Sequence, residues 1–326
     1  MDNSSHTGPF FITRADGVVS YRVAKQLLKA SGHPVVRLSL SNAKLATEFY
    51  EQGAEITPFD WMRAETYARA LVGIKTVFCT MPHITDGLEK FRLFTRACQT
   101  AGVKHVVKLS FTHAMVSEAD TMVGMGMARD KNDPFLRVPL VRMHRACDQR
   151  LMKLGHASSL HYTILFASHF MSNPAVYQGE SLRRDHVFYG ASHGQRVNYV
   201  SPNDVAEVSV RILLYPKTHY NVGYNLAGPE AITDGQVAQH LGAQLGLGEI
   251  KYIDQEDTES FLSRISDPDW GPAQDVADLE QLKATGVEDK LPTRSDIVKI
   301  CGHAGQNFGE YLQAKQLMSP LEVSSF

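Results

Sequence analysis

Short apolar runs alternate with amphipathic segments along the first half of the chain. The apolar runs are rich in Val, Ile, Phe and Thr and predict buried strands, whereas the segments between them repeat their apolar positions at helical spacing. The predicted strands cover residues 10–12, 35–40, 54–57, 76–80, 105–110 and 162–166. The predicted helices cover residues 20–30, 43–52, 64–71, 86–101 and 140–154. This alternation predicts an α/β fold, a doubly wound parallel sheet of the Rossmann type with right-handed crossovers.

Glycines follow four of the predicted helices, at Gly32, Gly53, Gly102 and Gly155. Helices often end on a residue in the left-handed conformation, which glycine adopts at little cost. We therefore expect each of these glycines to end its helix.

The pattern loosens after residue 166. Further helices are predicted over residues 202–214 and 234–245, and further strands over 224–227 and 248–254. Neither a repeat nor a clear linker separates the two halves, so we expect a smaller C-terminal α/β lobe built onto the first domain. We assign residues 1–166 to a Rossmann-type core and residues 167–326 to a substrate-binding lobe that shares its cleft.

Composition limits the partners. The 326 residues carry Lys+Arg 33 against Asp+Glu 35, without a long run of either sign, so neither nucleic acid nor a membrane is expected to bind. The N-terminus lacks a signal-peptide pattern, and the cysteines contain no C-x-x-C. The sequence predicts a cytoplasmic protein with reduced, packed thiols and a small-molecule substrate, and it is compatible with a homodimer.

The turn after the first predicted strand has the layout of a dinucleotide-binding turn, T-G-x-x-G-x-x-G. Thr13 and Gly17 are retained, but Arg14 stands at the first glycine and Ser20 at the third. The glycines of such a turn let the backbone approach a diphosphate at the helix N-terminus. The guanidinium of Arg14 either fills the phosphate position, so that the dinucleotide is lost, or makes a new bidentate phosphate contact. We favour loss, because several positions change together.

Several segments in sequence order resemble NmrA-like proteins, an atypical branch of the short-chain dehydrogenase superfamily. They are AGVKHVVKLS at 101–110, HRA at 144–146, YTIL and FMSN at 162–165 and 170–173, YVSPNDVA at 199–206, and YNLAGPE at 224–230. The resemblance implies a Rossmann-type domain that holds NADP(H) or NAD(H) and a lobe that closes over a substrate cleft. It also implies an adenine contact at Asp60, whereas Leu40 replaces the arginine expected for a 2′-phosphate.

The usual Tyr-x-x-x-Lys pair of this superfamily is missing from the helix where it belongs. The resemblance places His144 there, and a histidine can act as general acid or base near neutral pH or be purely structural. His113, Ser110 and Thr112 follow or end the fifth strand, where the superfamily usually has a catalytic Ser or Thr. The hydroxyls of Ser110 and Thr112 either polarise a substrate carbonyl or cap the next segment.

Strand ends and the loops after them supply the candidate substrate pocket. Its predicted residues are Met81, Pro82, His83, Phe111, Met125, His169, Phe170, Met171, Asn173 and Tyr177. Met125 belongs to a glycine-hinged loop at residues 122–127 that suits a lid, although it could also be a mobile segment or a subunit contact. The histidines lack a metal-binding spacing such as H-E-x-x-H, so we assign no metal.

Three functional hypotheses remain open. The favoured one is an enzyme that isomerises, dehydrates or cyclises an apolar secondary-metabolite intermediate by acid/base chemistry, with an eroded NAD(P) site and no required cofactor. The first alternative is an NAD(P)H-dependent reductase in which Arg14 contacts phosphate. The second is a non-catalytic regulator that senses a dinucleotide or metabolite.

Overall fold

A central parallel sheet dominates the computed structural model, which describes residues 8–82, 84–115, 134–246, 248–264, 273–286, 288 and 294–314. Within these ranges, seven strands run in the order β10-β6-β5-β4-β1-β2-β3. They are β1 (Phe10–Ile12), β2 (Val36–Leu38), β3 (Glu55–Ile56), β4 (Thr76–Cys79), β5 (His105–Phe111), β6 (His161–Ala167) and β10 (Val222–Leu226). The strand order reverses beside β1, where doubly wound sheets bind ligands. The predicted Rossmann-type fold is confirmed.

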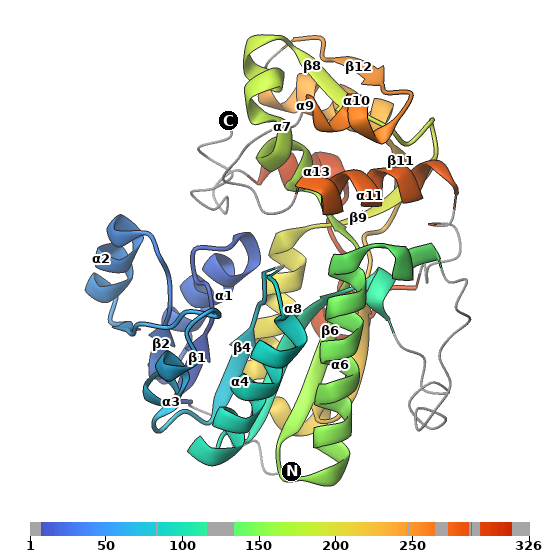
Figure 1. Ribbon diagram of the computed structural model, residues 1–326. Coiled ribbons are helices and arrows are strands. Elements are labelled where there is room, and N and C mark those ends of the chain that lie inside the picture. Colours follow the sequence, from blue (N-terminus) through green and yellow to red (C-terminus); the bar gives the residue numbers. More distant parts are fainter. Residues whose placement is uncertain are drawn as a thin grey trace.

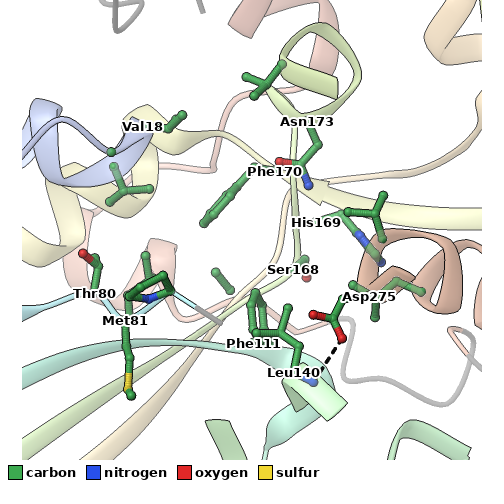
Figure 2. Close-up of a pocket in the computed structure, with 18 of the residues that line it drawn as sticks. Val18, Thr80, Met81, Phe111, Leu140, Ser168, His169, Phe170, Asn173 and Asp275 are labelled. Carbon is green, nitrogen blue, oxygen red and sulfur yellow. Dashed lines mark hydrogen bonds between the residues drawn. The ribbon is translucent and has the colours of Figure 1, made fainter. Parts of the chain in front are cut away.

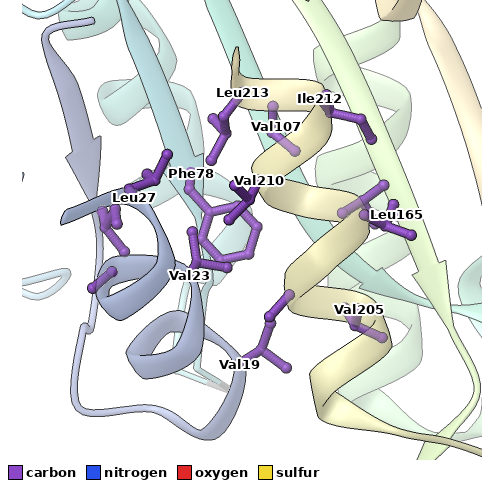
Figure 3. Close-up of a cluster of buried hydrophobic side chains, with 14 of the residues drawn as sticks. Val19, Val23, Leu27, Phe78, Val107, Leu165, Val205, Val210, Ile212 and Leu213 are labelled. Atoms are coloured by element: carbon purple, nitrogen blue, oxygen red, sulfur yellow. The ribbon is translucent and has the colours of Figure 1, made fainter. Parts of the chain in front are cut away.

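Helices cover both faces of this sheet (Figure 1). One face packs against α1 (Val18–Leu28), α2 (Ala43–Glu51), α8 (Pro202–Leu214) and α12 (Ile297–Cys301), and the other against α3 (Glu65–Leu71), α4 (Gly87–Ala101) and α6 (Pro139–Ala157). Side chains alternate along each strand, so Phe10 and Ile12 enter the first core and Phe11 the second. Figure 3 shows the first core, where Val19 and Val23 of α1 meet Phe78 of β4 and Val205 of α8.

The C-terminal lobe lies beyond the sheet edge at the top of Figure 1. It contains the sheet β11 (Ala231–Thr233), β9 (Arg196–Val200) and β7 (His169–Phe170), and the pair β12 (Lys251–Asp254) and β8 (Val187–Gly190). Its helices are α7 (Asn173–Arg184), α9 (Asp234–Leu245), α10 (Thr258–Leu262), α11 (Ala273–Ala284) and α13 (Phe308–Gln313). Short 3-10 helices span Thr112–Ala114, Pro134–Arg137 and Pro216–His219.

The chain returns to the core after it has entered the lobe. α8 packs on α1, and β10 pairs with β6 in parallel, although both elements follow residue 166. The lobe nevertheless has a buried cluster of its own around Met171, Phe188 and Tyr199. The division into residues 1–166 and 167–326 stays a prediction. α8 and β10 belong to the second part by sequence but pack in the core.

The predicted helix ends are partly confirmed. Gly102 ends α4 with φ +75°, and Gly53 follows α2 with φ +91°. Gly32, with φ +87°, lies in the turn a few residues beyond α1. The prediction for Gly155 is wrong, because α6 continues to Ala157. A Cβ atom at Gly155 would lie 2.3 Å from the Tyr162 ring, so this glycine permits close packing of α6 on β6.

The cysteines behave as predicted. Cys79, Cys98, Cys147 and Cys301 are all free and buried. Among the described helices, none combines the length and the apolar character that a membrane crossing requires.

Candidate active site

One cavity of about 350 Å³ opens at the carboxyl ends of β1, β4, β5 and β6, within the usual size range of ligand pockets. The lobe supplies its other wall through α7 and α11 (Figure 2). Its lining consists of Arg14, Gly17, Val18, Val19, Ser20, Thr80, Met81, Pro82, Leu109, Phe111, His113, Leu140, Ala167, Ser168, His169, Phe170, Asn173, Val176, Tyr177, Asp275, Val276 and Leu279. The cavity therefore joins the turn after β1 to residues from both halves of the chain.

The turn after β1 keeps the backbone shape of a glycine turn. Arg14 has φ +50°, in the left-handed region that normally favours glycine. Its backbone N–H donates to the Ser39 hydroxyl (3.1 Å), and its carbonyl accepts from the Gly17 N–H (2.9 Å). The arginine side chain is exposed. The substitution therefore costs about 1 kcal/mol of backbone strain without closing the turn.

The N-terminus of α1 faces this cavity. Gly17 is the N-cap with φ −73°, and no side chain caps the helix. A Cβ atom at Gly17 would lie 3.3 Å from the Arg14 carbonyl oxygen, a tight contact, so glycine suits this position for its small size rather than for its φ angle. Uncapped N–H groups and the positive end of the helix dipole bind phosphate readily.

Thr13 and Ser20 tie the turn to β4. The buried Thr13 hydroxyl oxygen accepts from the Thr80 N–H (2.8 Å), and the hydroxyls of Ser20 and Thr80 lie 3.2 Å apart. Thr13 therefore does not line the cavity. Asp60 also lies outside the lining, is exposed, and accepts from the Met62 N–H (2.8 Å). Of the predicted coenzyme residues, the cavity is lined by Arg14 and Gly17.

A buried polar network joins two of the predicted catalytic residues, Ser110 and His144, to Lys108 and Asp148. The Lys108 amino group lies 2.7 Å from Asp148 and 3.1 Å from Nδ1 of His144, and the Ser110 hydroxyl donates to Asp148 (2.5 Å). Burial raises the pKa of Asp148, against the opposing effect of Lys108. Neither Ser110 nor His144 lines the cavity; the His144 ring packs instead against Phe111, with centroids 4.6 Å apart.

Thr112 is also turned away from the cavity. Its buried hydroxyl donates to the Phe166 carbonyl (3.2 Å) and lies 3.3 Å from the Asn225 side-chain oxygen. The structure thus gives it a bonding role between β6 and β10.

His113 is the predicted catalytic residue that does reach the cavity. Its Nε2 lies 2.7 Å from Oε1 of Glu288, and Nε2 of His169 lies 3.1 Å from the same oxygen. Burial lowers the pKa of His169 to about 4, against the opposing effect of Glu288. Burial raises the pKa of Glu288, but His113 and His169 outweigh it and hold that pKa well below its usual range. The site thus carries an ionised carboxylate between two imidazoles.

These three side chains also have donor atoms within 4.8 Å of one another, a spacing that could hold a metal ion. Sequence motifs gave no sign of it, because positions 113, 169 and 288 are far apart in the chain. In the structure, both imidazoles form direct hydrogen bonds with the Glu288 carboxylate.

Seven of the ten residues predicted for the substrate pocket line this cavity. Met81, Pro82, Phe111, His169, Phe170, Asn173 and Tyr177 line the cavity. Met171 instead packs in the core of the lobe, and His83 and Met125, with the predicted lid, lie outside the described residues. Asp275 was not predicted; its carboxylate accepts from the Leu140 N–H (3.4 Å; Figure 2). In the sequence, an aspartate in the first turn of a helix indicates only helix capping, so nothing marked Asp275 as a cavity residue.

A parallel α/β sheet with an open helix N-terminus after its first strand is the architecture of a nucleotide-binding protein. The chain matches the model of the family described as NAD(P)H-binding over residues 15–216, and it belongs to this family.

Several relatives are oxidoreductases by name. An NAD(P)H azoreductase of Xenophilus azovorans is 27% identical over 298 residues, covering 87% of this chain and 93% of the relative. An agroclavine dehydrogenase of Claviceps fusiformis is 25% identical over 266 residues, covering 78% and 81%. An NADPH-dependent quinone oxidoreductase from Escherichia coli, complexed with NADPH, shares the fold with a TM-score of 0.73 at 21% identity, covering 94% and 99%.

These comparisons favour the reductase alternative over the non-redox hypothesis. They also favour NAD(P)H binding over our expectation that no cofactor is required.

Proposed function

We propose that the protein is an NAD(P)H-dependent reductase of a small, largely apolar organic molecule, within the NmrA-like branch. The observation that carries this proposal is that one cavity joins the turn after β1 to His113 and His169. A coenzyme bound at the turn and a substrate bound at the histidines would share this one cavity. The names of the relatives point to the same class of reaction.

The residues of the turn fit a dinucleotide. The N-terminus of α1 is uncapped, and Arg14 keeps a left-handed backbone. Among the described residues, no carboxylate pairs with the exposed Arg14 guanidinium, which lines the cavity edge. Arg14 and the first turn of α1 would therefore hold the phosphates, which is the second of the two interpretations given above. When bound, the nicotinamide supplies a hydride.

The other cavity residues divide into two roles. Leu109, Phe111 and Phe170 form apolar walls that bind the substrate body and exclude water. Reduction of a polar double bond also needs a proton, and α6 carries no tyrosine to deliver it. We assign proton donation to His113, which Glu288 orients through the 2.7 Å contact.

The test is a coenzyme-oxidation assay. Purified protein is mixed with NADPH or NADH and a panel of azo dyes and quinones, and the loss of reduced-coenzyme absorbance is followed. Substrate-dependent oxidation is expected. Coenzyme binding without oxidation by any acceptor would support the regulator instead, and absence of binding would support the non-redox enzyme.

A further inference from the structure

A second group of metal-ligand side chains lies outside the cavity, between α8 and the end of α12. Glu207 comes from the middle of α8, Cys301 is the last residue of α12, and His303 follows two residues later. Their donor atoms all lie within 4.8 Å of one another. A thiol, an imidazole and a carboxylate are the three kinds of protein ligand that Zn²⁺ takes, which sets this group apart from an ordinary ion pair.

The backbone brings Cys301 and His303 together. α12 ends at Cys301, and Gly302 adopts φ +80° while its N–H donates to the Val298 carbonyl (2.9 Å). This left-handed residue reverses the chain, so that His303 returns beside the helix it has just left. Glycine is required at position 302 because an L side chain would be strained at this φ.

Both ring nitrogens of His303 lie close to acceptor oxygens. Nδ1 lies 2.8 Å from the Ala304 carbonyl oxygen, and Nε2 lies 3.1 Å from Oε2 of Glu207. Both partners are acceptors, whereas a neutral imidazole carries only one N–H. Nε2 must therefore share either a second proton or a metal ion with Glu207. Donation from Nδ1 to a backbone carbonyl is the arrangement that orients metal-ligating histidines.

Glu207 is oriented from its other side. Its Oε1 accepts from Nη2 and Nε of Arg211 at 2.9 and 3.1 Å, which leaves Oε2 turned toward His303. A thiolate at Cys301 and this carboxylate would supply two negatively charged ligands to a divalent cation, with the Arg211 guanidinium as an outer partner of the carboxylate. Cys301 is buried and His303 is exposed, so one side of the group faces solvent.

We propose that Glu207, Cys301 and His303 bind Zn²⁺, with water as the fourth ligand of a tetrahedral site. This site goes beyond the proposed reductase function and does not depend on it. Zinc binds a cysteine as the thiolate, so binding must displace the proton of the Cys301 thiol. Binding should therefore release a proton and strengthen as the pH rises.

Cobalt substitution tests the site, because a cysteine ligand produces a thiolate-to-Co²⁺ charge-transfer band in the near ultraviolet. Metal-free protein is titrated with Co²⁺, and Zn²⁺ is then added as competitor. We expect the band to saturate at one equivalent of Co²⁺ and to disappear when Zn²⁺ is added. Cobalt bound at His113, His169 and Glu288 would not contribute, since that group contains no cysteine.

Two variants and a control complete the test. Cys301→Ser should abolish the band, and His303→Asn, at an exposed position, should weaken binding at least about tenfold. His193→Asn removes another exposed histidine near a carboxylate, 3.3 Å from Asp254, and should leave the band unchanged. Absence of the band in the wild-type protein, or its persistence in Cys301→Ser, would overturn the proposal. Neither result would bear on coenzyme oxidation.

Discussion

The amino group of Lys108 lies 2.7 Å from the carboxylate of Asp148, and both side chains are fully buried. This pair joins β5 to α6, and Ser110 and His144 bond to it from either side. Two residues whose sequence positions suggested catalysis thus belong to a network that holds the sheet against a helix.

Removing one partner of this pair should be costly. Asp148→Ala leaves the Lys108 amino group buried without its counter-charge, so we expect a loss of about 3–5 kcal/mol in the free energy of unfolding. Urea unfolding at neutral pH measures it. The double variant Lys108→Met/Asp148→Leu removes both charges and should recover much of the loss. A cost below about 1 kcal/mol for the single variant would mean that the pair contributes little.

The histidine pair predicts acid sensitivity. The pKa of His169 is about 4 in the folded protein, below its ordinary value of 6.5, so between these values the unfolded chain binds a proton that the folded protein excludes. Unfolding free energy should therefore fall as the pH drops from 6.5 toward 4, by up to about 3 kcal/mol. The depressed pKa of Glu288 acts in the same direction below its ordinary value of 4.5.

The variant His169→Gln isolates this contribution. It removes the titrating group, so the difference in unfolding free energy between neutral pH and about pH 4.5 should shrink. His156→Gln, at an exposed position, is the matched control and should leave the difference as in the wild type. An unchanged pH dependence in His169→Gln would contradict the assignment.

Arg14→Gly separates phosphate binding from backbone strain. Glycine suits φ +50°, so the free energy of unfolding of the variant should be higher by about 1 kcal/mol. If the guanidinium contacts phosphate, coenzyme affinity should fall about tenfold or more. A larger loss for NADPH than for NADH would place the contact on the 2′-phosphate, and equal losses would place it on the shared diphosphate. Tighter binding in Arg14→Gly would show that the arginine obstructs the site.

His113 and His144 give opposite expectations for turnover. His113→Asn should lower kcat about 100-fold while coenzyme affinity is kept, because His113 lines the cavity and would supply the proton. His144→Asn lies in the buried network and should mainly lower the melting temperature. The reverse pattern of kcat values would restore His144 as the proton donor.

The sheet was predictable because most of its first six strands are local apolar runs; the short β3, whose two residues Glu55 and Ile56 are exposed, is the exception. β1 was predicted with its observed bounds, as was α8. The lobe was harder, because β9 (Arg196–Val200) has polar side chains at Arg196 and Asn198 and gains its structure from pairing with β11 and β7. Its tertiary neighbours therefore determine it more than its own pattern does.

The site was less predictable for a geometric reason. Successive strand residues point to opposite faces, so Phe111 lines the cavity while Ser110 beside it faces Asp148. A sequence match gives the position of a residue along the chain but not the face of the sheet to which its side chain points. The contact between His113 and Glu288 joins residues 175 positions apart, and no spacing motif describes such a pair.

The most direct test of the reductase proposal is a calorimetric titration of the wild-type protein with NADPH and NADH. The open N-terminus of α1 and the exposed Arg14 predict one binding site for at least one coenzyme, with a dissociation constant of about 0.1 mM or below. Absence of binding by both coenzymes at about 1 mM would contradict it.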